Sequence, residues 1–312
     1  MLGAWLERKR LFLLYRIDGA SVGDVVTATG FMRGVHEATG RRFVVVSKYP
    51  DIFRDNPLVE RNIGIGELGF LAKPLVKAVV RHARHANIGE YGYRPRAGAT
   101  EADIARDHQR AISELQYCSE ALAARWQVAL DYSALRPELY LSRDERVDFE
   151  RTHALSRGYW AIRPVGQTSY TPNKEWGFER YQDVVRRNPG IRWVQIGTSR
   201  DPLLEGALDL RGRTTLRELF CVIAGARGVL SGEGLPNHVA AAFGVPSLVV
   251  FTGFSHTELA RYPNTVAIAR RPQVACAPCW KLSPCPVPGM PCSAGVTVEQ
   301  VSAEIERFAR AA

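Results

Sequence analysis

Asp24 is the first residue in the chain whose type and place could support acid–base chemistry. It follows the apolar run Leu11–Ile17, which reads as a buried strand, and it lies in the first turn of a helical pattern that Ser21 can cap. A carboxylate at such a turn can take a proton from a substrate hydroxyl. An acidic residue is also ordinary at a helix N-terminus, where it caps the helix. Both interpretations of Asp24 stay open.

A second polar group lies in the stretch Val229–Phe251, which reads as a strand, a polar turn, a short alanine-rich helix and another strand. The turn carries Glu233 and Gly234, and His238 follows at the start of the helix. The first-turn N–H groups and the dipole of a helix favour negative charge, so the pattern predicts an anion-binding corner. A histidine whose ring nitrogens are satisfied inside the protein is an equally good interpretation of His238.

The polar loop Thr168–Lys174 precedes another predicted helix. Hydroxyls of Thr168 and Ser169 could donate hydrogen bonds to a phosphate. Lys174 could offset the negative charge that builds on a phosphate leaving group. The alternative for Lys174 is a surface lysine in front of a helix.

Four cysteines lie between Cys276 and Cys292 with the spacing C-x2-C-x5-C-x6-C. The four are Cys276, Cys279, Cys285 and Cys292. Four thiolates in a proline-stiffened loop can close a tetrahedral zinc or iron site of a structural kind. Free thiols or paired disulfides fit the same spacing. No part in the chemistry follows from this loop.

Basic residues recur in the predicted amphipathic helix Leu68–Ala86. Lys73, Lys77, Arg81 and Arg84 follow at steps of four, four and three, which places them on one helix face. A solvated surface is the simplest interpretation of this face. A cationic wall for a phosphorylated acceptor or for anionic lipid headgroups is the functional one.

Length and charge restrict the class of protein. With 312 residues and 46% hydrophobic content, the chain can form two domains with cores of their own. A formal charge of +9 favours an anionic partner, such as a nucleotide sugar, a phosphorylated glycan or a membrane surface. The basic residues are scattered and no nucleic-acid-binding module is present, so nucleic acid is the least favoured partner.

The N-terminus has a short apolar run and no small-residue cleavage site, so it fails as a signal peptide. No apolar stretch approaches the roughly 20 residues of a spanning helix. We therefore expect a soluble, cytoplasmic protein, and peripheral contact with the inner face of a membrane stays open.

Strands alternate with helices in both halves of the chain. This alternation predicts an α/β protein with two doubly wound, Rossmann-like domains facing across a cleft. We place the boundary near Ser156–Tyr159, giving domains 1–156 and 157–312. Ligands of such sheets bind beyond the carboxyl ends of the strands, where Asp24 and the Val229–Phe251 turn are expected.

Several segments, taken in order, resemble glycosyltransferase family 9, the heptosyltransferase-like enzymes of bacterial surface glycans. In the first half these are Gly23-Asp24-Val25-Val26, Asn56-Pro57-Leu58-Val59 and Arg136-Pro137-Glu138-Leu139-Tyr140. In the second half they are the stretches Asn173–Tyr181, Gly212–Leu219 and Val229–Phe251. Each piece alone is a weak signal, whereas their order and spacing over most of the chain are specific.

The resemblance implies a GT-B fold, with the acceptor on the first domain and a nucleotide diphosphate sugar on the second. It implies an inverting enzyme that needs no metal for catalysis, with Asp24 as the base and Lys174 at the diphosphate. Gly197 and Thr198 correspond to the nucleoside site and Leu216 to the residue that packs on the base. Some protein-heptosylating relatives bind iron through cysteines.

The segment Ser231–His238 departs from the family's usual form, an Asp-Ser/Thr-Gly followed by a His. Here Glu233 stands at or next to the acidic position, with Gly234 after it and His238 further on. The leading hypothesis is the transfer of heptose from ADP-heptose to a surface glycan, such as a lipopolysaccharide core, or to a protein. The alternatives are a GT-B enzyme with another nucleotide sugar, and a non-catalytic nucleotide-sugar-binding or scaffold protein.

Overall fold

The computed structural model describes residues 2–17, 21–88, 130, 135–166, 171–258 and 260–311. These residues form two compact units, which divide between Ser142 and Arg143. Thr168 and Ser169, and the stretch that carries the predicted helix Glu101–Gln127, lie outside the described residues. No helix in the described part of the chain is long and apolar enough to cross a membrane.

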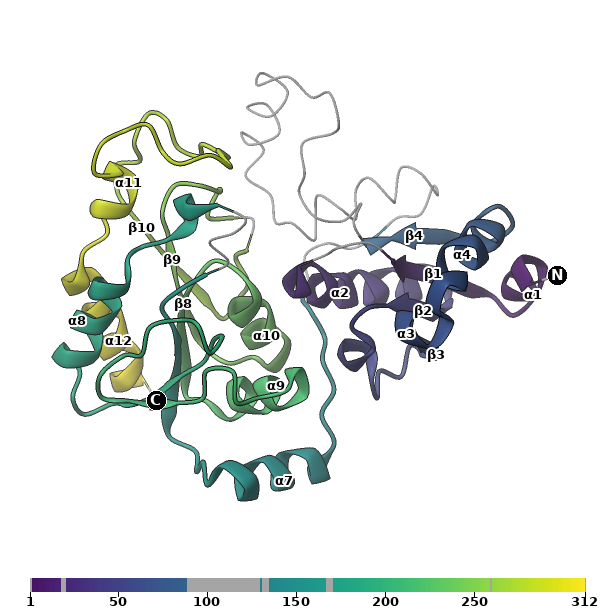
Figure 1. Ribbon diagram of the computed structural model, residues 1–312, viewed down its shortest axis with the longest axis horizontal. Helices are drawn as coiled ribbons and strands as arrows, with labels where there is room; N and C mark the ends of the chain where they lie inside the picture. Colours follow the sequence, from purple (N-terminus) through teal and green to yellow (C-terminus); the bar gives the residue numbers. More distant parts are fainter. Residues whose placement is uncertain are drawn as a thin grey trace. The chain divides into compact units, whose positions relative to one another are not determined.

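The N-terminal unit contains a parallel sheet with the strand order β3-β2-β1-β4 (Figure 1). Its strands are β1 (Leu11–Arg16), β2 (Arg42–Ser47), β3 (Val59–Gly64) and β4 (His85–Asn87). Strand β1 pairs with both β2 and β4, so it lies inside the sheet, and the predicted buried strand is confirmed.

Helix α2 (Val22–Thr39) connects β1 to β2. The Ser21 hydroxyl accepts a hydrogen bond from the Asp24 N–H, and Gly40 ends the helix with a left-handed φ of 64°. Both features are the start and stop signals expected from the sequence. They fix Asp24 in the first helical turn after the sheet.

Helices α1 (Leu2–Arg8) and α4 (Ala72–Val80) pack against one face of this sheet. Their contacts use alternate strand residues, Leu11 and Leu13 in β1 and Val44 and Val46 in β2. Because strand side chains alternate between faces, Phe12, Leu14, Phe43 and Val45 belong to the opposite face, and all four are buried.

The predicted helix Leu68–Ala86 was wrong in extent. The segment divides into α3 (Ile65–Leu68), the 3-10 turn η2 (Gly69–Leu71) and α4, with Gly69 and Pro74 near the joins. Lys73 and Lys77 are exposed on α4, whereas Arg81 only caps it and Arg84 precedes β4. The four basic residues therefore do not share one helix face.

The C-terminal unit contains a parallel sheet with the order β10-β9-β8-β5-β6-β7. Its strands, in chain order, are β5 (Tyr159–Arg163), β6 (Arg192–Gln195), β7 (Ala207–Asp209), β8 (Gly228–Gly232), β9 (Ser247–Phe251) and β10 (Thr265–Ala269). The chain adds β6 and β7 on one side of β5 and then β8, β9 and β10 on the other side, so the strand order reverses between β5 and β8. This is the switch point at which open α/β sheets bind ligands.

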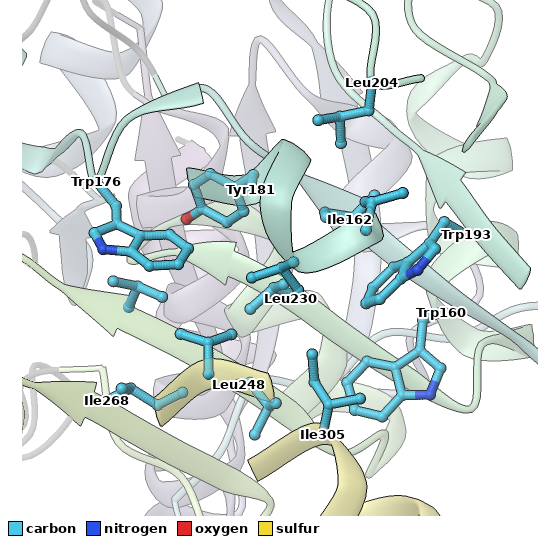
Figure 2. Packing of buried hydrophobic residues seen from close by; sticks show 14 of the residues in the cluster. Trp160, Ile162, Trp176, Tyr181, Trp193, Leu204, Leu230, Leu248, Ile268 and Ile305 are labelled. Carbon is cyan, nitrogen blue, oxygen red and sulfur yellow. The ribbon is translucent and has the colours of Figure 1, made fainter. Parts of the chain in front are cut away.

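Aromatic and aliphatic side chains pack together on one face of this sheet (Figure 2). Trp160 and Trp193 meet edge to face at 6.1 Å, and Trp176 meets Tyr181 at 4.9 Å. The helices that contribute to this core are α8 (Phe178–Arg187) and α12 (Val298–Ala311). Two further helices, α9 (Leu216–Gly225) and α10 (Leu235–Phe243), pack against each other.

The segment between the two sheets differs from expectation. The sequence pattern predicts a short strand at Pro137–Leu141, and this prediction is wrong, because the segment is irregular and α7 (Arg143–His153) follows. Helix α7 packs on α9, where the buried Arg217 donates to both carboxylate oxygens of Glu145 at 2.7 and 2.6 Å. This pair groups α7 with the C-terminal unit, although the predicted domain 1–156 had included it.

Candidate functional site

An ion pair lies at the switch point of the C-terminal sheet. Lys174 ends the short 3-10 turn η4 (Pro172–Lys174), which lies between β5 and α8, and Glu233 directly follows β8. The Lys174 Nζ lies 2.6 Å from the Glu233 Oε2, and the two side chains are 27% and 17% exposed. The structure thus brings together two residues predicted at the donor site that are 59 positions apart in the sequence.

Phe254 and Ser255, which follow β9, contact the two members of this pair. The Lys174 ammonium lies over the Phe254 ring, 5.1 Å from its centre, and the Ser255 hydroxyl donates to Glu233 at 3.3 Å. Burial raises the pKa of Glu233, but the charge and hydrogen bond of Lys174, together with His238 and Ser255, outweigh it, and the pKa lies below its usual value. The carboxylate therefore stays ionised and holds the lysine at the carboxyl ends of the strands.

The ion pair predicts a pH dependence of stability. Because the folded-state pKa of Glu233 is lowered, the pair stabilises the fold above the unfolded carboxyl pKa of about 4.3, and this contribution is lost as pH falls through the lowered folded value. We expect the stability difference between wild type and Glu233→Gln to shrink on acidification below pH 4.3. Melting temperatures of wild type and Glu233→Gln, measured over a range of pH, give this difference. Glu179→Gln, which changes an exposed carboxylate, is the control. A difference that stays constant to about pH 3 would contradict the ionised pair.

Arg163, at the end of β5, was not predicted as a site residue. Its Nε has no hydrogen-bond partner within the described part of the chain, and burial lowers its pKa. The carboxylates of Asp201 and Glu175 attract its charge, and Glu175 accepts a hydrogen bond from the Gly166 N–H at 2.9 Å. Arg163, the last residue of β5, thus adds a second cation at the carboxyl end of the sheet.

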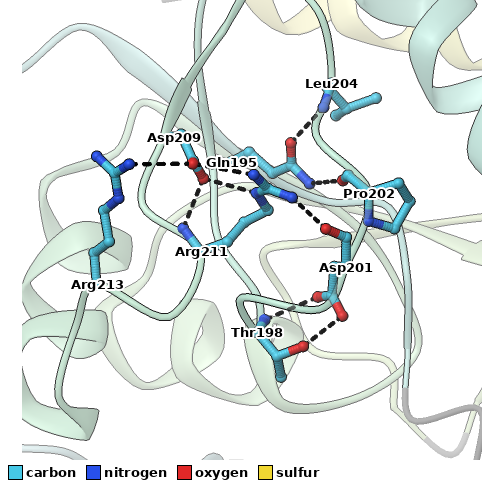
Figure 3. Close-up of polar contacts among 8 residues, drawn as sticks. All are labelled: Gln195, Thr198, Asp201, Pro202, Leu204, Asp209, Arg211 and Arg213. Carbon is cyan, nitrogen blue, oxygen red and sulfur yellow. Dashed lines mark hydrogen bonds and ion pairs between the residues drawn. The ribbon is translucent and has the colours of Figure 1, made fainter.

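Gly197 and Thr198 follow β6 at the same edge of the sheet (Figure 3). Gly197 has a φ of 146°, and a Cβ there would lie 2.2 Å from the Asp201 carboxylate. Thr198 donates to Asp201 through both its N–H, at 2.9 Å, and its hydroxyl, at 2.6 Å. Asp201 closes this turn, so the Thr198 hydroxyl is engaged within the protein. A nucleoside contact at this turn stays a prediction.

The start of α10 is less rich in donors than the sequence suggests. Gly234 has a φ of 149°, which L-residues rarely adopt, and the space beside its Cα is open. Pro236 has no N–H, and the Asn237 N–H donates to the Gly234 carbonyl at 3.1 Å. The helix terminus therefore adds few free N–H donors to the Lys174 and Glu233 charges.

His238 lies inside the unit, with 4% of its surface exposed. Its Nδ1 is 2.7 Å from the Tyr262 hydroxyl, and the two rings pack edge to face. Its positive form would lower the pKa of Glu233 further. The Tyr262 contact agrees with the satisfied, structural interpretation, and direct contact with a ligand stays a prediction.

Asp24 and Leu216 occupy helix starts in different units. Asp24 is partly buried after β1, and Leu216 is partly buried as the first residue of α9. A capping box formed by Thr215 and Glu218 sets the start of α9. The geometry places each residue at the carboxyl edge of its own sheet, and their roles stay predictions.

The cysteine loop supports the ion pair through its backbone. Asn173, next to Lys174, donates from its side-chain amide to the Lys281 and Ser283 carbonyls at 2.7 and 2.8 Å. The Trp280 N–H donates to the Phe254 carbonyl at 3.0 Å, and their rings lie 5.2 Å apart. The loop therefore holds both segments that contact the lysine.

The predicted zinc or iron site is not formed by the described residues, which contain no group of three or more His, Cys, Asp or Glu side chains able to hold a metal ion. Cys276 is exposed, and Cys279, Cys285 and Cys292 are partly buried free thiols. Burial raises the pKa of Cys292, and its neighbours Cys279 and Cys285 raise it further. A thiol with a raised pKa is less ready to lose the proton that metal ligation displaces.

Phe254 and Ser255 were missed because they lie about twenty positions after Glu233, with no local motif around them. One signal was available. Strand β9, which begins just after Pro246, runs parallel to β8. The residues that follow β9 therefore reach the same sheet edge as Glu233, which follows β8.

Comparison with known proteins places these observations in a family. Residues 106–286, more than half of the chain, match the sequence profile of glycosyltransferase family 9 (heptosyltransferase). Among curated proteins, none matches the chain by sequence.

Solved structures share the fold at low sequence identity. A family 9 glycosyltransferase of Veillonella parvula DSM 2008 is 14% identical with a TM-score of 0.67, covering 96% of this chain and 97% of that one. E. coli ADP-heptose lps heptosyltransferase II is 17% identical with a TM-score of 0.65, covering 95% and 98%.

The iron-containing dodecameric glycosyltransferase TibC of enterotoxigenic E. coli H10407 is 16% identical with a TM-score of 0.65, covering 96% of this chain and 76% of that one. At such identities the likeness shows the fold alone. It confirms the predicted GT-B fold, with two units that each carry a parallel sheet.

Proposed function

Because the chain belongs to glycosyltransferase family 9 and is a glycosyltransferase, we propose that it transfers heptose from ADP-heptose to a saccharide or protein acceptor. The observation that carries the proposal is the Lys174–Glu233 pair at the switch point of the C-terminal sheet. E. coli heptosyltransferase II, which shares the fold, is named for ADP-heptose.

Lys174 would bind the donor diphosphate. An ammonium carries three N–H donors, so one lysine can serve a carboxylate and a phosphate together. Glu233 fixes the position of Lys174 before the donor arrives, which reduces the reorganisation needed as the leaving group gains charge. Arg163 would strengthen the positive potential at the same edge.

Asp24 would act as the general base on the acceptor side. The acceptor hydroxyl gives its proton to the Asp24 carboxylate while its oxygen attacks the anomeric carbon. The bond from that carbon to the diphosphate oxygen breaks, and ADP leaves with the electron pair. A single displacement of this kind inverts the anomeric configuration. No step of the proposed reaction runs through a metal ion.

Nucleotide binding tests the donor assignment. A ligand bound only by the folded protein stabilises it by about 2.7 kcal/mol at a concentration of about 100 Kd. We expect ADP and ADP-heptose to raise the melting temperature by several degrees in a thermal-shift screen, and UDP and GDP to raise it much less. Calorimetric titration of the same nucleotides gives the affinities.

Indistinguishable binding of ADP, UDP and GDP would contradict the ADP-heptose assignment and leave a GT-B enzyme for another nucleotide sugar. Donor binding without any release of nucleoside diphosphate in the presence of acceptors would favour a binding protein that does not turn over.

The proposed acceptor is a surface glycan, such as a lipopolysaccharide core, assembled at the cytoplasmic face of a membrane. The net charge of +9 supports an anionic acceptor or surface. The proposed location is therefore cytoplasmic, with peripheral contact at the inner face of that membrane.

A further inference from the structure

An apolar cavity of about 500 Å³ lies in the N-terminal unit between the helices α1 and α4 and the sheet. Trp5 and Leu6 of α1, Leu13 and Val46 of the sheet, and Leu75 and Val79 of α4 are among the residues that line it. Protein interiors rarely contain voids larger than a water molecule, and this volume lies in the range of ligand pockets. Among the described residues of the lining, Arg61 is the one charged residue and the others are apolar, so the cavity suits a hydrocarbon chain.

The outer side of this layer exposes large apolar side chains. Phe70 is 89% exposed, Leu71 54% and Leu75 39%. Leu75 lines the cavity and is also exposed at the surface, so it joins the cavity to this patch. Large apolar side chains that lie exposed and close together in the sequence often mark an interaction site.

The charge along α4 has one sign. Lys73 and Lys77 are exposed on α4, and Arg81 follows at its end. The sequence has no Asp or Glu from Leu68 to Ile88. Apolar side chains beside clustered basic residues complement a surface that offers hydrocarbon beneath negative headgroups.

We propose that Phe70, Leu71, Lys73, Leu75 and Lys77, here called the α4 surface, dock on an anionic phospholipid bilayer, with an acyl chain entering the cavity. A phosphorylated saccharide would satisfy the lysines but not the exposed Phe70 and Leu71. The inference rests on the membrane location in the proposed function and names the surface for it. Vesicle binding requires neither donor nor acceptor, so its failure is distinguishable from a failure of the transferase assignment.

Co-sedimentation tests the surface. The wild type should sediment with phosphatidylcholine vesicles that contain phosphatidylglycerol and not with phosphatidylcholine alone. We expect Phe70→Ser/Leu71→Ser and, separately, Lys73→Gln/Lys77→Gln to weaken partitioning about tenfold or more. Leu203→Ser and Arg227→Gln, both exposed in the C-terminal unit, are the matched controls. Equal binding of Phe70→Ser/Leu71→Ser and wild type, at equal melting temperatures, would overturn the proposal.

Fluorescence tests the cavity. Trp5 lines it, so vesicles whose acyl chains carry bromine should quench part of the wild-type emission. Trp5→Phe should still sediment with anionic vesicles and should lose this quenching. Quenching of equal size in Trp5→Phe and wild type would show that the acyl chain does not enter the cavity.

Discussion

Asp24→Asn is expected to reduce glycosyl transfer by about 10²–10⁴-fold, the contribution typical of a general base. The amide keeps the size of the side chain but cannot accept the acceptor's proton. Release of ADP from ADP-heptose in the presence of acceptor measures the effect on kcat. Unchanged turnover would remove Asp24 as the base.

Helix α2 offers the control that separates catalysis from folding. Asp24 lies in its first turn, where an acidic residue stabilises a helix by about 0.3–1 kcal/mol, so Asp24→Asn should cost the fold little. Glu37→Gln changes an exposed carboxylate further along the same helix. It should leave turnover at the wild-type level, and a similar loss in both variants would point to damage to the helix.

Lys174→Ala is expected to slow transfer by about 10²–10³-fold, the range seen when one stabilising donor is removed from a transition state. Donor binding should also weaken by about 1.5–3 kcal/mol, the contribution of a hydrogen bond to a charged group. Rates measured over a range of donor concentrations give both kcat and KM. Wild-type donor affinity in this variant would count against contact with the diphosphate.

Removal of Lys174 also leaves the Glu233 carboxylate without its cation, and this effect must be separated from the loss of a phosphate ligand. The double variant Lys174→Ala/Glu233→Gln removes the stranded charge as well. The double variant should melt at a higher temperature than Lys174→Ala, but its rate of glycosyl transfer should stay as low. Recovery of transfer would show that Lys174 serves only to neutralise Glu233.

The local signals in the sequence were sufficient for most of the strands. Continuous apolar runs and the Ser21 and Gly40 caps are short-range features, and β1 and α2 follow from them. Periodicity failed between Leu68 and Ala86, because the basic residues keep helical spacing beyond Val80, where α4 ends. Arg81 only caps α4 and Arg84 precedes β4, so the spacing does not correspond to one helix.

The assembly of the site depends on long-range contacts that spacing does not reveal. The Lys174–Glu233 pair follows from the order of β5 and β8 in the sheet, and Phe254 joins through β9. The cysteine loop was expected to have at most a metal-binding role, yet its carbonyls hold Asn173 beside Lys174. No sequence spacing encodes backbone contacts between segments about 110 residues apart.

The central claim is a division of labour in which Lys174 binds the donor and Asp24 activates the acceptor. Calorimetric titration of wild type, Asp24→Asn and Lys174→Ala with ADP-heptose tests it most directly, because it needs no acceptor. We predict that Asp24→Asn binds the donor as wild type does and that Lys174→Ala binds it at least tenfold more weakly. Equal donor affinity in wild type and Lys174→Ala, or a selective loss in Asp24→Asn, would contradict the account.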